Sequence, residues 1–422
     1  MQSQTSCPFT AFVGIDWADT KHDICLKVAD EAQYRFDCIA HTPASIEQWA
    51  LSIHQAYGGP IAIAVELSKG PLIAALQKYD FLVLFPINPA TLARYRRAFV
   101  PSGAKDDPSD AQWALELLLT HPEKFPPLNP TSPAMRALGS LTEQRRHLVD
   151  DKVGVSNRLC STLKQYYPLA LELFEDHGTV LFSHFLQRWP SLAQLKRARP
   201  ATLEKFFDTH NVRRSALSQR RYELISQAVP LTEDPAIIEP SRLYVLALID
   251  QLNVLLAAIK RFDSEIDELA NSLEDYKIFQ ALPGAGKQLA PRLMVAFGDQ
   301  RDRFSCASDV QKYAGIAPVT ERSGKKHWVH WRWQCTTFLR QTFVEWAAQS
   351  IHRSAWAKAF YGQQRAKGST YQAALRALAF KWIRIVYQCW KTSTVYDEAI
   401  YQKALGLHGS PLLERITQRT SN

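Results

Sequence analysis

The first 90 residues alternate short apolar runs with polar turns, a pattern that predicts β-strands. Three strands are predicted in succession, at Phe12–Trp17, Asp23–Val28 and Gln33–Ile39. Two more are predicted at Ile61–Glu66 and Phe81–Pro86, with helically spaced apolar residues between and after them. Three strands in a row, followed by alternation of strand and helix, predict an α/β domain built on a mixed sheet with helices packed on it.

Helical periodicity dominates the rest of the chain. A long helix is predicted from about Met135 to Tyr166, and a second apolar seam recurs in steps of three and four residues from Val245 to Leu269. The seam consists of Val245, Leu248, Leu252, Leu255, Ile259, Phe262, Ile266 and Leu269. This spacing is the a/d pattern of a coiled coil. Two interpretations stay open: a contact between chains, giving a homo-oligomer, and a helical hairpin with the 135–166 helix inside one chain.

Four regions follow from these patterns. Residues 1–125 form the predicted α/β domain, and a proline-rich stretch at 122–133 is typical of a linker,. Residues 126–272 form a helical, coiled-coil region in which the part around 175–240 carries no recognisable motif. Residues 273–395 form a mostly helical C-terminal domain, and residues 396–422 form a polar tail.

Composition narrows the class of partner. The formal net charge is +9, which favours a polyanion, nucleic acid before membrane. No apolar run reaches the roughly 18 residues of a membrane span. The seven cysteines are scattered without C-x-x-C spacing, which argues against a zinc site and favours a reducing, cytoplasmic location.

Four carboxylates end predicted elements of the first domain. Asp16 and Glu66 each end an apolar strand, and Asp107 and Asp110 flank the start of a helix. Together they have the hard oxygen ligands that Mg²⁺ or Mn²⁺ prefers. For Asp107 and Asp110 alone, helix capping around Pro108 explains the pattern equally well. Asp106 is a further candidate ligand for the metal ion, beside Asp107 and Asp110, and the sequence alone does not exclude it.

A basic loop in the C-terminal domain contains a candidate nucleophile. Ser323 stands beside Gly324 and among cations, at Arg322, Lys325 and Lys326. Such cations neutralise phosphate oxygens, although Ser-Gly is also a common turn pair. Tryptophans at 328, 331 and 333 are interleaved with Lys326, His330 and Arg332. Val329, Trp331 and Trp333 alternate along the chain and would face one side of a strand, which fits either a packed strand or base stacking.

Further candidate contacts to nucleic acid are spread over the chain. Glycines in Leu282-Pro283-Gly284-Ala285-Gly286, followed by Lys287, are similar to the hairpin of helix-hairpin-helix motifs, whose backbone N–H groups hold phosphate,. The remaining candidates are Arg94, Arg96, Arg97, Lys105 and Arg332.

Taken in order, these motifs resemble the insertion-sequence 110 family of transposases, described as bridge-RNA-guided recombinases. The N-terminal matches are Gly14-Ile15-Asp16, Glu66 and the K-x-D-x-x-D-A run at Lys105–Ala111, which resemble a RuvC-like, ribonuclease-H-type domain. The C-terminal matches are Leu282–Gly286, Tyr313–Pro318, Ser323-Gly324 and Ala374–Trp382. Asp106 departs from the family pattern, which has a neutral residue there.

The resemblance implies more than the residues alone. It implies a metal-binding tetrad at Asp16, Glu66, Asp107 and Asp110, and a nucleophilic serine at Ser323. It also implies joining of donor and target DNA through a covalent phosphoserine, guided by a non-coding RNA that pairs with both DNAs. RNA guidance agrees with a basic chain that shows no helix-turn-helix or zinc finger, because base pairing then reads the sequence.

Two alternatives remain. A metal-dependent junction nuclease would use the same four acids with water as the attacking group, and would form no DNA–protein adduct. A non-catalytic, basic nucleic-acid-binding assembly protein built on the coiled coil would function normally after Asp16→Asn.

Overall fold

A computed structural model describes residues 9–66, 69–99, 107–128, 131–211, 215–333, 335–410 and 412, with the side chains of 107–108 and 215–218 outside the description. The chain divides into two compact units, residues 1–130 and 131–422. The predicted Lys105 and Asp106 lie outside the described residues, as does the side chain of Asp107.

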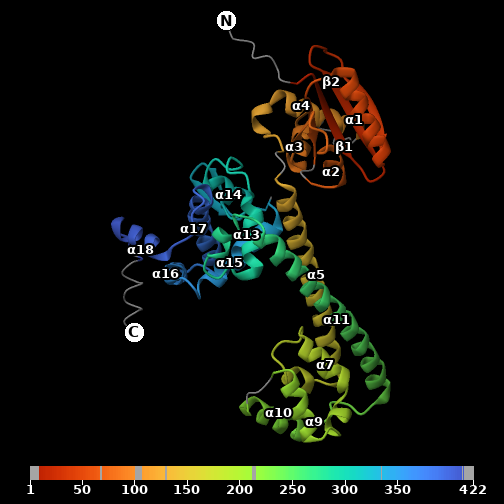
Figure 1. The fold of residues 1–422 in the computed structure, drawn as a ribbon, viewed down its shortest axis with the longest axis vertical. Helices are drawn as coiled ribbons and strands as arrows, with labels where there is room; N and C mark the ends of the chain where they lie inside the picture. Colours follow the sequence, from red (N-terminus) through yellow and green to blue (C-terminus); the bar gives the residue numbers. More distant parts are fainter. Residues whose placement is uncertain are drawn as a thin grey trace. The chain divides into compact units, whose positions relative to one another are not determined.

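The first unit is built on a mixed sheet of five strands (Figure 1). The strands are β1 Ala11–Trp17, β2 Lys21–Val28, β3 Arg35–Ala40, β4 Ile61–Val65 and β5 Leu82–Pro86. Their order in the sheet is β3-β2-β1-β4-β5. The first three pair antiparallel, whereas β4 pairs parallel with both β1 and β5. The mixed sheet predicted from the apolar runs is confirmed, and its arrangement is consistent with a ribonuclease-H-like domain.

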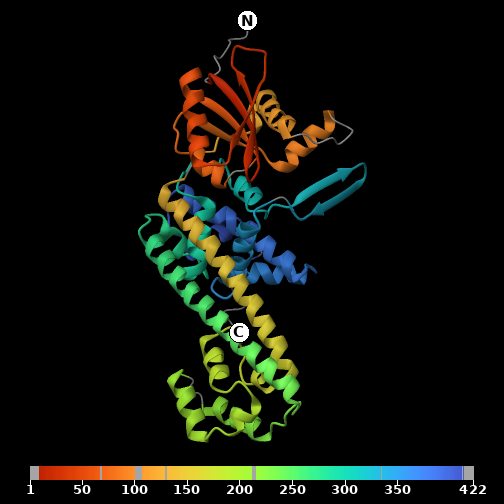
Figure 2. The ribbon, with the colours of Figure 1, turned by 90° about the vertical axis from the view of Figure 1, so that its right-hand side faces the viewer.

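Helices cover both faces of this sheet (Figure 2). They are α1 Pro43–Tyr57, α2 Pro71–Leu76, α3 Pro89–Phe99 and α4 Asp107–Thr120, with a short 3-10 turn at Pro122–Lys124. Side chains alternate between the two faces of a strand. Val13 and Ile15 therefore join the apolar core with α1 and α2, while Ala64 of β4 joins a second core with α3 and α4.

The second unit contains two long antiparallel helices, α5 Pro133–Tyr166 and α11 Pro235–Asn271 (Figure 1). The start of α5, at Leu138, shares a core with Ile266 of α11, and the end of α5, at Leu159, shares another with Leu248. Arg145 of α5 is also paired with Asp263 of α11 at 2.5 Å.

All eight predicted seam residues of α11 are buried or half-buried. The seam therefore packs inside one chain, as the helical-hairpin interpretation expects, and a coiled coil between chains stays a prediction. By length and composition alone α11 could cross a membrane, but this is weak evidence because one of its faces packs on α5.

Short helices enclose the far end of this hairpin. They are α6 Leu169–Glu172, α7 Val180–Arg188, α8 Leu192–Lys196, α9 Pro200–Thr209 and α10 Ser215–Gln227. Their aromatic side chains, including Phe185 and Phe207, form one core with Leu159 and Leu248. The region without a recognisable motif is therefore a helical cap built on the α5–α11 hairpin.

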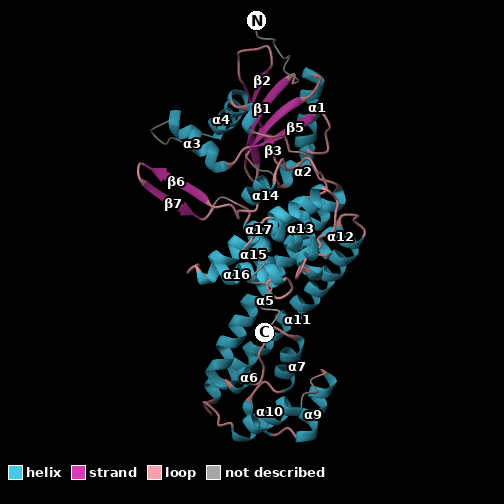
Figure 3. Cartoon of the chain, turned by 90° about the vertical axis from the view of Figure 1, so that its left-hand side faces the viewer, coloured by secondary structure: helices cyan, strands magenta, loops and turns pink. Residues whose placement is uncertain are grey.

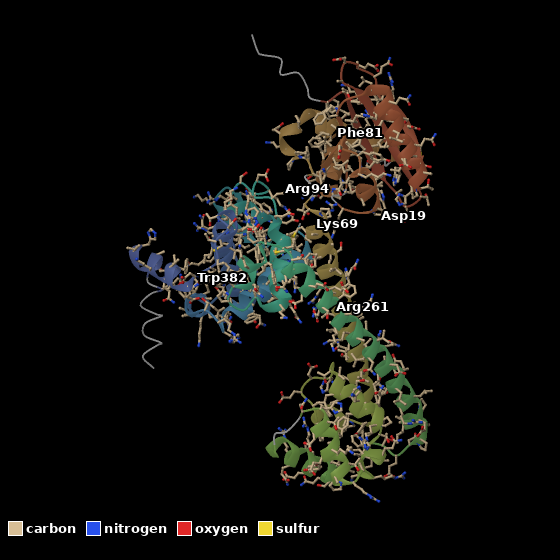
Figure 4. The ribbon with its side chains drawn as sticks, viewed as in Figure 1. Asp19, Lys69, Phe81, Arg94, Arg261 and Trp382 are labelled. Carbon is tan, nitrogen blue, oxygen red and sulfur yellow. The ribbon has the colours of Figure 1, made fainter. Side chains whose placement is uncertain are left out.

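In the described residues, the C-terminal part of the second unit is mostly helical. Its helices are α12 Tyr276–Gln280, α13 Gly286–Phe297, α14 Ala307–Tyr313, α15 Thr337–Ser350, α16 Ala355–Ala366, α17 Tyr371–Lys391 and α18 Glu398–Leu407. Trp346, Trp356 and Trp382 are fully buried among them, and Trp382 is labelled in Figure 4. Each indole N–H is satisfied: Trp346 donates to the Pro283 carbonyl at 3.0 Å, and Trp382 to the Ser350 hydroxyl at 2.8 Å.

Part of the predicted polar tail is helical. Residues 398–407 fold as α18, and Tyr396 and Leu405 are buried in the main core of the unit. Tyr396 accepts a hydrogen bond from Trp356 at 2.8 Å. Tyr396 and Leu405 thus fix the segment to the core of the unit.

A two-stranded hairpin, β6 Val319–Ser323 and β7 Lys326–His330, extends from these helices (Figure 3). Every residue from 320 to 330 is exposed. The packed-strand interpretation of the tryptophan segment is therefore wrong: β7 buries neither face, and Trp331 and Trp333 lie beyond its end. The hairpin has no hydrophobic core of its own, which leaves its side chains available to a partner.

Candidate active site

Parallel pairing places two of the predicted carboxylates side by side. In the register of β1 and β4, Ile15 lies opposite Val65, so Asp16 and Glu66 follow at the same edge of the sheet. Neighbouring strands are about 4.8 Å apart. Gly14 and Ala64, two residues earlier, both face α4 and α3, so alternation directs Asp16 and Glu66 to that same face.

Gly14 lets α4 approach this edge. A Cβ atom at Gly14 would overlap the backbone oxygen of Ala111 and lie 2.9 Å from the Cβ of Leu115. Only glycine therefore fits where α4 crosses β1. Asp110 directly precedes Ala111 and is 6% exposed. The glycine of the Gly-Ile-Asp motif thus brings the start of α4 to the carboxylate edge.

Asp110 is held by an arginine. Arg96 of α3 donates from Nη1 to both carboxylate oxygens of Asp110, at 2.6 and 2.7 Å. The two side chains are 19% and 8% exposed. Arg96 was predicted as a contact to nucleic acid on the same footing as Arg94 and Arg97. In the structure it faces inward and gives Asp110 a cationic partner, whereas Arg94 (Figure 4) and Arg97 are exposed on α3.

One carboxylate at this edge was missed by the sequence reasoning. Asp23 of β2 lies directly opposite Asp16 in the antiparallel register and is 7% exposed. Cross-strand partners share one face of a sheet. Asp23 is paired with Lys21 at 3.3 Å. The signal available in the sequence was an acid inside the apolar run of β2.

The structure brings together some of the predicted tetrad and does not test the rest. Asp16 and Glu66 are neighbours, and α4 carries Asp110 to the same face. Among the residues that the structure describes, no group of three or more acidic, histidine or cysteine side chains is placed to hold a metal ion. Asp110 faces Arg96, and the side chain of Asp107 is outside the description. The four-carboxylate site therefore stays a prediction.

Ser323 lies at the tip of the β6–β7 hairpin. It pairs with Lys326, so Gly324 and Lys325 form a two-residue loop. Gly324 has a φ of +57°, and a Cβ there would meet nothing within 4 Å. Positive φ at the first loop residue is the usual requirement of such hairpin turns. The turn thus presents Ser323 to solvent, with Arg322 and Lys325 beside it in the chain.

The other predicted nucleic-acid contacts have mixed surroundings. A Cβ at Gly284, where φ is +76°, would lie 2.7 Å from the backbone carbonyl carbon of Gln349, so this glycine is required for packing against α15. Gly286 is open. Lys287 pairs with Asp267 at 2.8 Å, and Arg332 donates to the carbonyl of Ala317 at 3.3 Å.

Comparison with known proteins shows the class of protein to which the chain belongs. Two family models match the chain, and both describe transposases: one, the DEDD transposase model of IS110, over residues 13–168, and another, the transposase model of the IS116/IS110/IS902 family, over residues 276–362. The first match spans the carboxylate edge, and the second spans Ser323. The chain belongs to the IS110 family of transposases.

Curated relatives agree with this assignment. The chain is 29% identical to the mini-circle putative transposase for IS117 of Streptomyces coelicolor, over 92% of this chain and 96% of the relative. It is 24% identical to the 43.6 kDa protein of insertion element IS110 from the same organism, over 70% and 73% of the two chains. It is 26% identical to the pilin gene-inverting protein of Moraxella bovis, over 34% and 47%.

Proposed function

We propose that this transposase joins the DNA of a mobile element to a target by cutting strands through a covalent phosphoserine at Ser323. Membership of the family supports an enzyme that acts on DNA. One relative is named for the inversion of a pilin gene, and strand exchange through a covalent intermediate conserves the phosphodiester bonds that such an inversion requires. The observation that carries the proposal is the exposed serine between cations at the hairpin tip.

The carboxylate edge supports metal dependence. Asp16, Glu66, Asp107 and Asp110 would hold Mg²⁺ or Mn²⁺, since carboxylate oxygens are the ligands these hard cations prefer. The pairing of Asp110 with Arg96 shows that one of these acids already accepts a cation. A bound divalent ion would supply charge stabilisation at the transferring phosphoryl group.

The proposed step is a phosphodiester exchange. The Oγ of Ser323 forms a bond to phosphorus, the bond from phosphorus to one strand end breaks, and that end leaves as a hydroxyl that takes the proton. Arg322, Lys325 and Lys326 stand where they would neutralise phosphate oxygens. A serine hydroxyl needs activation. No described histidine or carboxylate is hydrogen-bonded to Ser323, and we infer that the metal site activates the serine, either within one chain or between two protomers.

Guidance by a non-coding bridge RNA and assembly into a dimer or tetramer are further parts of the proposal. The net charge of +9 suits a large nucleic-acid partner,. The exposed residues of the β6–β7 hairpin include aromatic and basic side chains that would stack on bases and contact phosphates without reading sequence,. Base pairing with an RNA would then select the target.

The decisive experiment compares Ser323→Ala with Thr320→Ala, which removes another exposed hydroxyl from the same hairpin. Purified protein is incubated with Mg²⁺, element-end DNA and co-purified RNA, then denatured and run on a gel. We expect a DNA–protein adduct with wild type and Thr320→Ala and none with Ser323→Ala.

Strand cutting by Ser323→Ala at the wild-type rate would instead establish the water-dependent nuclease. Absence of strand cutting by the wild-type protein, with normal function after Asp16→Asn, would instead establish the non-catalytic assembly protein. Sequencing the co-purified RNA tests guidance separately, because a guide must match DNA flanking the coding region.

A further inference from the structure

A cavity of about 690 Å³ lies in the second unit, between α17 and the base of the β6–β7 hairpin. Its volume is in the range of pockets that hold small organic ligands. The apolar part of its lining includes Ile316, Phe360, Ala377 and Phe380. Ser323 is not among the residues that line this cavity.

The polar part of the lining is entirely basic. Arg332, Arg376, Lys381 and Arg384 line the cavity, and no carboxylate is among its described lining residues. Burial lowers the pKa of Arg376, and repulsion from Arg340 lowers it further. Burial, followed by the nearby Arg384, lowers the pKa of Lys381 in the same way. Half-buried cations that repel each other and have no acidic neighbour are stabilised by an anion.

Cationic side chains lie over aromatic rings at the walls of the cavity. The guanidinium of Arg376 lies 4.4 Å from the ring centre of Trp331, and Arg340 lies 4.7 Å from that ring. The ammonium of Lys381 lies 4.9 Å from the ring centre of Phe360. Planar, partly apolar rings with cations over them are surfaces on which nucleobases stack.

The walls are also built rigidly. Both Ile316 and Ala317 donate their backbone N–H to the carbonyl of Gln311 at 2.9 Å. Gln311, which is 3% exposed, donates its amide to the carbonyl of Phe380 on α17 at 2.8 Å. A Cβ at Gly315, where φ is +69°, would lie 2.6 Å from the Cβ of Cys335. The Tyr313–Pro318 motif thus fixes one wall of the cavity to the helix that carries its cations.

We propose that this cavity binds one unstacked nucleotide of a nucleic-acid strand, with its base against Phe360 and Phe380 and its phosphate on Arg376 and Lys381. A base and a phosphate match the two halves of the lining. The strand can belong to DNA or to RNA, since both offer this chemistry.

The cavity lies at the base of the hairpin that carries Ser323 at its tip. Val329 and His330, at the base of β7, line it, while Lys326 pairs with Ser323 at the tip. Four residues of strand separate the two ends by about 13 Å, which is the length of about four stacked nucleotides. A nucleotide held in the cavity would fix the strand close to the proposed nucleophile. This last point rests on the proposed function, whereas binding itself does not.

The test uses the full chain and measures binding without cleavage. Fluorescently labelled oligonucleotides of about twelve residues, as single-stranded DNA, single-stranded RNA and duplex DNA, are titrated by anisotropy. The variants are Arg376→Gln and Lys381→Met, with Lys358→Met as a control that removes an exposed charge from α16. Arg384→Gln, at the exposed rim, covers the case in which the buried variants unfold.

We expect about tenfold weaker binding of single strands for Arg376→Gln and Lys381→Met, and a salt dependence reduced by about 0.7 in log–log slope for each lost phosphate contact. Duplex binding should change less than threefold. Loss in the DNA arm alone assigns the nucleotide to DNA, and loss in the RNA arm alone assigns it to RNA. Folded variants that bind single strands like wild type, or lose duplex binding equally, would overturn the proposal. Ser323→Ala should bind normally, so failure of the serine chemistry is seen separately.

Discussion

Substituting Gly14 by alanine tests whether the crossing of α4 over β1 positions the carboxylates of the proposed metal site. The added Cβ would lie 2.9 Å from the Cβ of Leu115 and overlap the oxygen of Ala111. Carbon atoms in contact prefer about 3.5–4.0 Å. The start of α4 must therefore retreat from the sheet by about 1 Å, and it carries Asp107 and Asp110 with it.

Two magnitudes follow. Overpacking of this kind costs about 1–3 kcal/mol of folding free energy, which lowers the melting temperature by about 3–10 °C for a unit of this size. A displacement of about 1 Å in a catalytic group reduces the rate roughly 10²-fold, equivalent to about 2.7 kcal/mol in the barrier. We expect Gly14→Ala to fold, to bind nucleic acid and to cut DNA about a hundredfold more slowly.

The measurements are thermal unfolding and the single-turnover rate of strand cutting at saturating Mg²⁺. Gly154→Ala is the matched control: it adds the same methyl group on α5, where it meets nothing within 4 Å. Alanine there should stabilise the helix by about 0.5–1 kcal/mol without affecting cutting. An unchanged melting temperature for Gly14→Ala would refute the close crossing. A lower melting temperature with a normal cutting rate would show that α4 does not position the acids.

Two further variants test Arg96 and the α11 seam. Arg96→Gln leaves Asp110 without its cation, so the protein without metal should lose about 1.5–3 kcal/mol of stability. Added Mn²⁺ should then raise the melting temperature of Arg96→Gln more than that of wild type or of the control Arg97→Gln, whose arginine is exposed. Equal increases in melting temperature would contradict competition between Arg96 and the metal. Leu255→Glu should lower the stability of the α5–α11 hairpin by about 1–3 kcal/mol, whereas Val254→Glu, at a position 70% exposed, should not. Unchanged unfolding of Leu255→Glu would contradict the packing of the seam. Light scattering measures the particle mass, and a smaller mass for Leu255→Glu would show that the seam also joins chains.

The sheet could be predicted from the sequence because burial acts locally on strands. Apolar runs marked all five strands to within about two residues, since each strand buries consecutive or alternate side chains against helices. The α11 seam was readable for the same reason. Its partner was not, because the same spacing serves a contact inside one chain and a contact between chains, and only the fold pairs Leu138 with Ile266.

The parts that could not be predicted depend on contacts between distant segments. Arg94, Arg96 and Arg97 are equivalent in the sequence, and the fold alone turns Arg96 toward Asp110, fourteen residues away. Asp23 became a neighbour of Asp16 through the register of a hairpin whose turn had not been assigned. The basic cavity was invisible because its lining comes from separate segments, such as Ile316, Phe360 and Arg376.

The two halves of the proposed chemistry stand on elements of opposite rigidity. Asp16 and Glu66 end central strands of a five-stranded sheet, whose positions are fixed by packing on both faces. Ser323 ends an isolated two-stranded hairpin, and such hairpins are only marginally stable in water. Its base is held where Arg340 and Arg376 both lie over the ring of Trp331, at the edge of the basic cavity. A strand bound in that cavity would engage the same side chains, so the substrate itself would order the nucleophile. A serine that becomes ordered only on bound nucleic acid would attack only when a strand is in place.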